Sequence, residues 1–173
     1  MKRIGILGGI GSGKSYVAQI FGCPVFNADK EVGYLYKKDK KIFHKLKKSL
    51  PKYFNKFPVN KNDVTRAILD KEQNLKKIIE IIHLEIRKKM NKFLKKNKNM
   101  KFVVLDIPLL LENKINRKGD ILVFVDSKKN DVLKRLKKRS NFNFKILKKF
   151  QNIQLSLDYK KKKSKFLIKN NFT

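Results

Sequence analysis

The chain has 173 residues and one cysteine, a length that suits a single domain with its own hydrophobic core and a composition that excludes an internal disulfide. The sequence shows no leader segment and no apolar run long enough to cross a bilayer, so we expect a soluble, cytoplasmic protein without membrane contacts. The formal net charge of +31 comes almost entirely from lysine, and abundant asparagine, isoleucine and phenylalanine share its A/T-rich codons. We interpret the charge as coding bias, so a nucleic-acid partner is not expected, although the field should attract polyanionic ligands.

The first predicted element is a strand over Ile4–Leu7, and a glycine-rich loop with the pattern G-x-x-x-x-G-K-S follows it directly at Gly8–Ser15. A strand, such a loop and then a helix form the context in which this pattern binds the phosphates of a nucleoside triphosphate. Lys14 is expected to reach the β- and γ-phosphates, and the Ser15 hydroxyl to ligate Mg²⁺. A glycine-rich turn without a ligand is the alternative, and the complete pattern argues against it.

A helix and a second strand follow the loop, over Ser15–Phe21 and Pro24–Asn27, with Gly22 as the helix C-cap. The next part of the chain has helical periodicity. Its predicted helices are Lys41–Leu50, a segment through Ile68 and Leu69 that Asn62 or Asp63 caps, and Leu75–Leu94 with a long apolar stripe. Such a block between strands of an α/β core is suited to covering a substrate.

Two continuous apolar runs, Phe102–Asp106 and Ile121–Asp126, predict central strands that are buried on both faces. Ser127 and Asp131 mark the start of the helix that follows. The remaining predicted elements are a helix around Ile146–Leu157 and a last short strand at Phe166–Ile168.

Two aspartates lie at the carboxyl ends of predicted strands, where open α/β sheets bind their ligands. Asp29, after the second strand, can accept a proton from a substrate hydroxyl, or it can cap a helix. Asp106 is in the position of an acid that holds Mg²⁺ beside Ser15, with a strand-end turn as the alternative. Glu112 is a weaker candidate for the same metal site.

Arginine is scarce in this chain, so Arg135 and Arg139 on one predicted helix are notable. A guanidinium can stabilise charge on a transferred phosphoryl group or stack on adenine, and a solvated helix face is the alternative. His83 lies in the apolar stripe of the long helix, where a histidine is usually a packing residue.

The chain resembles the dephospho-CoA kinase family over essentially its whole length. The resemblance is carried by the G-G-I-G-S-G-K-S loop, N-A-D at 27–29, D-I-P-L-L-L-E at 106–112 and I-K-N-N at 168–171. It implies ATP-dependent phosphorylation of the ribose 3′-hydroxyl of dephospho-CoA, the last step of coenzyme A biosynthesis. It also implies a fold with a nucleotide-kinase-like core, a helical CoA-binding part and a small lid.

The resemblance implies a role for each matching residue. Asp29 would activate the 3′-hydroxyl and His83 would contact the acceptor, while Lys14 and Arg139, the latter from the lid, would act on the phosphates. The residues implied to bind ATP are Gly9, Gly11, Ser12, Gly13, Lys14, Ser15, Tyr16, Arg135 and Asn170, and those implied to hold Mg²⁺ are Ser15 and Asp106.

Several positions depart from the family pattern. Asn27 replaces the first acid of D-A-D, Tyr16 and Leu7 replace threonines around the loop, and Leu84 replaces the proline after the histidine. Relatives usually continue into a helix where this chain reaches Thr173, so we expect weaker closure over adenine or a less stable core, with the reacting groups unaffected.

The fold class we predict is α/β, a three-layer P-loop NTPase core with a parallel sheet, a helical substrate-binding insertion and a small lid, in one kinase domain over 1–173. Its subregions are the core at 1–29 and 100–130, the helical region at 30–99, the lid at 131–163 and a terminal core strand at 164–173. The expected cofactors are ATP and Mg²⁺, and a monomer is favoured. The alternatives are a P-loop kinase for another small hydroxyl or nucleotide, a nucleic-acid-binding P-loop protein and a non-catalytic binder.

Overall fold

The computed structural model describes residues 1–139 and 142–172. It divides into two compact units. The sheet unit consists of Met1–Asn27 and the described residues from Leu94 onward, and the helical unit consists of Ala28–Phe93. Each unit is described by itself below.

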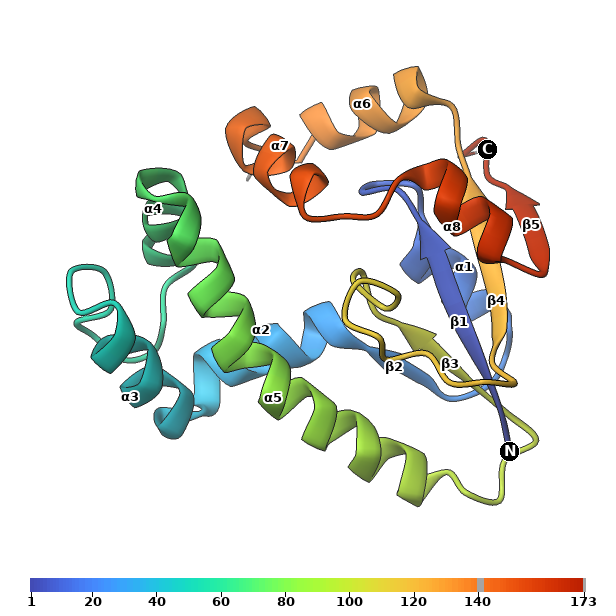
Figure 1. Ribbon diagram of the computed structural model, residues 1–173, viewed down its shortest axis with the longest axis horizontal. Helices are drawn as coiled ribbons and strands as arrows, with labels where there is room; N and C mark the ends of the chain where they lie inside the picture. Colours follow the sequence, from blue (N-terminus) through green and yellow to red (C-terminus); the bar gives the residue numbers. More distant parts are fainter. Residues whose placement is uncertain (140–141, 173) are drawn as a thin grey trace. The chain divides into compact units, whose positions relative to one another are not determined.

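Within the described residues, the sheet unit contains one parallel sheet of five strands in the order β2-β3-β1-β4-β5 (Figure 1). Every strand predicted from the apolar runs is confirmed. The strands are β1 (Lys2–Gly8), β2 (Val25–Asn27), β3 (Phe102–Asp106), β4 (Ile121–Asp126) and β5 (Phe166–Lys169).

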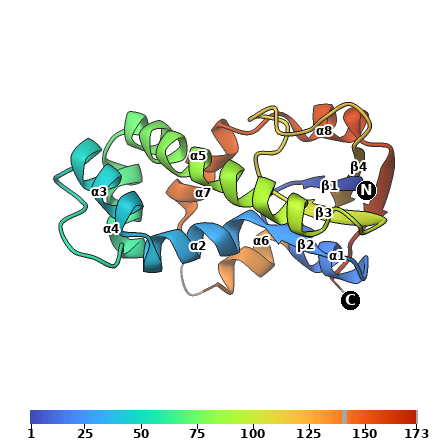
Figure 2. The ribbon, with the colours of Figure 1, turned by 90° about the horizontal axis from the view of Figure 1, so that it is seen from below.

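The central strands read as continuous apolar runs because helices cover both faces of the sheet. Helices α1 (Lys14–Ile20) and α8 (Leu157–Lys163) lie on opposite faces (Figure 2). On the α1 side, Val17 and Ala18 pack against Ile4 and Ile6 of β1 and against the buried valines of β3 and β4. This packing fixes α1, and hence the loop before it, to the carboxyl end of β1.

The sheet unit also contains α6 (Lys129–Lys137) and α7 (Phe144–Asn152). The single helix predicted around Ile146–Leu157 is wrong, because α7 ends at Asn152 and α8 begins anew at Leu157. The Ser156 hydroxyl caps α8 by accepting the Tyr159 N–H at 3.2 Å. The Ser156 cap therefore lies inside the segment predicted as one helix and separates two short helices. The lysine run 160–163 belongs to the second of them, α8.

The helical unit is formed by α2 (Ala28–Lys38), α3 (Lys40–Ser49), α4 (Lys61–Asp70) and α5 (Glu72–Lys96) up to Phe93. The predicted stripe of α5 is buried, with Leu75, Ile78 and Ile82 each 6% exposed or less. The cap of α4 is Asn60, whose side chain accepts the Asn62 N–H, so the prediction of Asn62 or Asp63 was wrong by two or three residues. No described helix has both the length and the apolar character that a membrane span requires.

Candidate active site

The glycine-rich loop between β1 and α1 requires glycine for steric reasons. Gly13 precedes α1 with a φ of 89°, in the left-handed region that favours glycine. A Cβ atom at this position would lie 2.1 Å from Nδ2 of Asn170, which no packing tolerates. The backbone of the loop is therefore in direct contact with the segment after β5.

Two side chains hold the loop from the ends of neighbouring strands. The Ser12 carbonyl accepts hydrogen bonds from Asn170 Nδ2 at 2.9 Å and from Ser127 Oγ at 3.0 Å. Ser127 is therefore not the cap of α6, as the sequence suggested, because its hydroxyl is directed to the loop and Lys128 takes the cap position. These two hydrogen bonds hold the loop to the strand ends.

The Lys14 ammonium lies over the same loop. It donates to the carbonyl of Gly9 at 2.6 Å and to that of Gly8 at 3.3 Å. A phosphate carries a full negative charge and so accepts a stronger hydrogen bond from the Lys14 ammonium than these neutral carbonyls do.

The two predicted metal ligands, Ser15 and Asp106, both accept a hydrogen bond from the side-chain amide of Asn27. Nδ2 of Asn27 donates to Oδ2 of Asp106 at 2.5 Å and to Oγ of Ser15 at 3.4 Å. Asp106 is 3% exposed, at the end of β3, so its carboxylate is largely removed from water. One hydroxyl and one carboxylate beside a phosphate loop fit Mg²⁺, which takes few protein ligands and completes its shell with phosphate and water oxygens. Within residues 1–139 and 142–172, no three acid, histidine or cysteine side chains form a metal site on their own.

Glu112 belongs to a different cluster from the one the sequence suggested. Its Oε1 accepts from the Lys160 ammonium at 2.7 Å and from the Leu155 N–H at 3.0 Å. The carboxylate thus connects the segment after β3 to the start of α8. Glu112 is thus an ion-pair residue, and its weaker candidacy for the metal site stays a prediction.

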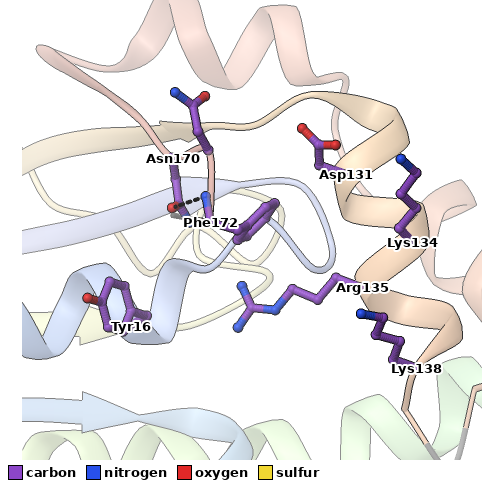
Figure 3. A pocket seen from close by; sticks show the side chains of 8 residues that line it. Tyr16, Asp131, Lys134, Arg135, Lys138, Asn170 and Phe172 are labelled. Atoms are coloured by element: carbon purple, nitrogen blue, oxygen red, sulfur yellow. Dashed lines mark hydrogen bonds between the residues drawn. The ribbon is translucent and has the colours of Figure 1, made fainter.

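A pocket of about 450 Å³ lies beside the loop in the sheet unit. Its walls are Tyr16 of α1, polar residues of α6 and the turn after it, and the segment 170–172 after β5 (Figure 3). The Arg135 guanidinium carbon is 4.7 Å from the centroid of the Phe172 ring. Arg139 lies beyond the end of α6, is exposed and does not line this pocket. The two arginines that the sequence paired are therefore in different surroundings.

Asp29 and His83 belong to the helical unit. Asp29 is exposed in the first turn of α2, which begins directly after β2. His83 is half-buried on α5, and its Nε2 has no hydrogen-bond partner among the described residues. Burial, and then the charge of Arg87, lower the pKa of His83, so the imidazole is neutral at pH 7. The roles assigned to both residues remain predictions.

The sequence missed three residues of this site. Ser127 was taken for a helix cap, Asn27 only for a replaced acid, and Phe172 was not considered. The first two lie at strand ends near the loop and could have been found by that position. Nothing local in the sequence indicates that Phe172 meets Arg135.

Comparisons with known proteins agree with this geometry. A family model described as dephospho-CoA kinase matches residues 2–173. The dephospho-CoA kinase of Wolbachia pipientis is 35% identical over 170 residues, which cover 95% of this chain and 87% of that protein. The enzyme of the same name from Bartonella henselae is 36% identical over 132 residues, 73% of this chain and 67% of that protein.

Solved structures show the same fold. A Thermus thermophilus protein has a TM-score of 0.75 at 23% identity, covering 99% of this chain and 90% of that one. A dephospho-CoA kinase from Campylobacter jejuni has a TM-score of 0.60 at 21% identity, covering 99% of this chain and 89% of that one. The predicted α/β kinase fold is confirmed.

Proposed function

Because the chain belongs to the dephospho-CoA kinase family, we propose that it transfers the γ-phosphoryl group of ATP to the ribose 3′-hydroxyl of dephospho-CoA. This reaction is the last step of coenzyme A biosynthesis. The observation that carries the proposal is the phosphate loop, which Asn170 and Ser127 hold in shape next to the Ser15 and Asp106 oxygens. The reaction consumes ATP, so we place the protein in the cytoplasm.

Catalysis of phosphoryl transfer consists mainly of positioning the reactants and stabilising charge. The Lys14 ammonium exchanges the loop carbonyls for the β- and γ-phosphates, while Gly9, Gly11 and Gly13 allow the backbone to approach them. Ser15 and Asp106 would hold Mg²⁺, which neutralises charge on the phosphate oxygens when it is bound. Arg139, exposed beyond the end of α6, is the proposed source of a further cation for the transferred group.

Asp29 is the proposed base for the acceptor hydroxyl. It follows Asn27 by two residues, so chain geometry alone keeps its Cα within about 8 Å of that of Asn27, which contacts Asp106 and Ser15. An exposed carboxylate at this place can orient the 3′-hydroxyl and accept its proton. His83, neutral at pH 7, can contact the acceptor through a hydrogen bond without adding charge.

The direct test is to incubate the protein with MgATP and dephospho-CoA and to locate the added phosphate by phosphorus NMR. We expect a phosphate on the ribose 3′-oxygen, and Lys14→Ala should lose most of the activity. A panel of other small hydroxyl compounds and nucleotides serves as the control for acceptor choice. Phosphorylation of one of these in preference to dephospho-CoA would overturn the proposed acceptor.

Asp29→Asn tests the base. The amide keeps the shape of the carboxylate but cannot take a proton, so we expect turnover to fall about 10²-fold or more with ATP affinity unchanged. Glu31→Gln is the matched control, since Glu31 is the other acid of the first turn of α2. Wild-type turnover in Asp29→Asn would rule out this assignment.

A further inference from the structure

The base of a bound nucleotide needs a surface to stack on, and we propose that Phe172 provides it together with Arg135. The inference rests on the proposed function only in requiring a nucleoside triphosphate as ligand. It assigns a nucleotide-binding role to an aromatic side chain that no sequence motif indicates.

The first step of the argument is the contact itself. The Arg135 guanidinium carbon lies 4.7 Å from the centroid of the Phe172 ring, a distance typical of a cation stacked on an aromatic face (Figure 3). Guanidinium is planar, so it can stack on a ring on one side and on a base on the other. Lys134 and Lys138 also line the pocket, but an ammonium is a point charge and offers no such plane.

The second step is that Phe172 is held in place by the phosphate loop. Its N–H donates to Oδ1 of Asn170 at 3.2 Å, and Nδ2 of Asn170 donates to the Ser12 carbonyl at 2.9 Å. The backbone of Phe172 has a φ of 60°, a conformation that a bulky residue adopts only where its surroundings favour it. One asparagine therefore bonds both to the loop and to the backbone that carries the aromatic side chain.

The third step is the distance from the phosphates. A Cβ atom at Gly13 would lie 3.3 Å from the ring edge of Phe172, so the ring is next to the residue that precedes Lys14. A pocket this close to the loop is within reach of the base of a triphosphate whose phosphates the loop binds. The pocket of about 450 Å³ is large enough for it, because small-molecule sites range from about 300 to 1,000 Å³. A base entering the pocket adds a third layer to the stack of Arg135 and Phe172.

The experiment measures binding without turnover, by calorimetry with ATP and with inorganic tripolyphosphate as separate ligands. Phe172→Ala should weaken ATP binding about tenfold or more, since one stacked base contributes that much, and should leave tripolyphosphate binding within about twofold. Phe172→Tyr keeps the aromatic face and should bind ATP like the wild type, whereas Phe172→Leu keeps most of the volume and should resemble Phe172→Ala. Phe166→Ala is the matched control, because Phe166 is 53% exposed on β5 and does not line the pocket.

Three results would overturn the inference. Unchanged or tighter ATP binding in Phe172→Ala would show that the ring is idle or blocks the base. Equal weakening of ATP and tripolyphosphate would show that the substitution distorts the loop, and wild-type ATP binding in Phe172→Leu would show that only side-chain volume matters. A protein that binds ATP in this manner but does not phosphorylate dephospho-CoA would refute the proposed acceptor and leave this inference standing.

Discussion

Lys160 shows how one residue can differ from its neighbours in a charged run. It lies among four consecutive lysines, yet its side chain is 1% exposed and its ammonium pairs with the buried Glu112 at 2.7 Å. Gln154 Oε1 accepts a further hydrogen bond at 3.4 Å. Because α8 packs on the sheet, one lysine of the run must point inward, and a carboxylate compensates its charge.

We expect Lys160→Met to lower the free energy of unfolding by about 3–5 kcal/mol, because it leaves the Glu112 carboxylate buried without its cation. Lys161→Met is the matched control in the same helix. Lys161 pairs with Asp126 at the surface with 49% of its side chain exposed, so its loss should cost less than about 1 kcal/mol. Urea denaturation measures both values, and the combined change Glu112→Leu with Lys160→Met should recover much of the loss. Equal effects of the two single lysine variants would contradict the burial of this pair.

At the scale of the element, the phosphate loop requires glycine at position 13, because Asn170 after β5 lies directly against it. Gly13→Ala combines a left-handed φ of 89° with a Cβ atom 2.1 Å from Asn170, so it must break the bond from Asn170 to Ser12. We expect a loss of about 2–3 kcal/mol in unfolding free energy, from backbone strain and one lost hydrogen bond, together with weaker ATP binding. Denaturation and calorimetry measure the two effects.

Gly33→Ala is the control for this substitution. Gly33 lies inside α2, and apart from its chain neighbours and the backbone of its own helix no described atom lies within 4 Å of an added Cβ, so alanine there should raise the unfolding free energy by about 0.5–1 kcal/mol. A Gly13→Ala protein as stable as the wild type would show that the loop has more freedom than its contacts imply.

The elements that could be predicted are those whose pattern is local. The strands of the core follow from uninterrupted apolar runs, and the phosphate loop follows from eight consecutive residues. Helix α2 was expected only as the alternative in which Asp29 caps a helix, because α2 begins at Ala28 directly after β2, without a turn to mark its start. The break between α7 and α8 was missed because neither glycine nor proline marks it. The contact between Arg135 and Phe172 depends on how α6 packs against the segment after β5, and no local sequence pattern predicts this packing.

At the scale of the whole molecule, the charge of +31 belongs to the surface. Among the described residues, the buried cationic side chains are Arg3, paired with Asp120, and Lys160, paired with Glu112. The other described lysines are in contact with solvent and attract polyanions without a geometry that selects one sequence.

We therefore expect binding to a single-stranded RNA to weaken about a hundredfold or more between 50 and 200 mM salt, as counterion release dictates. MgATP, which we propose is held by the phosphate loop and by the pocket at Arg135 and Phe172, should lose less than about tenfold over the same range. Fluorescence anisotropy with a labelled oligonucleotide and calorimetry with MgATP measure the two slopes. RNA binding that persists at high salt would restore the nucleic-acid hypothesis.

The two hydrogen bonds to the Ser12 carbonyl have a thermodynamic consequence. Among the described strands, β5 is an edge strand that pairs with β4. Asn170 follows β5 and Ser127 follows β4, so the ends of both strands bond to the Ser12 carbonyl of the phosphate loop. A ligand that stabilises the phosphate loop must also favour the pairing of β5 with β4. By reciprocity, stable pairing of β5 must raise the affinity of the loop for the nucleotide. Detachment of β5 from the sheet and release of the nucleotide are therefore expected to favour each other.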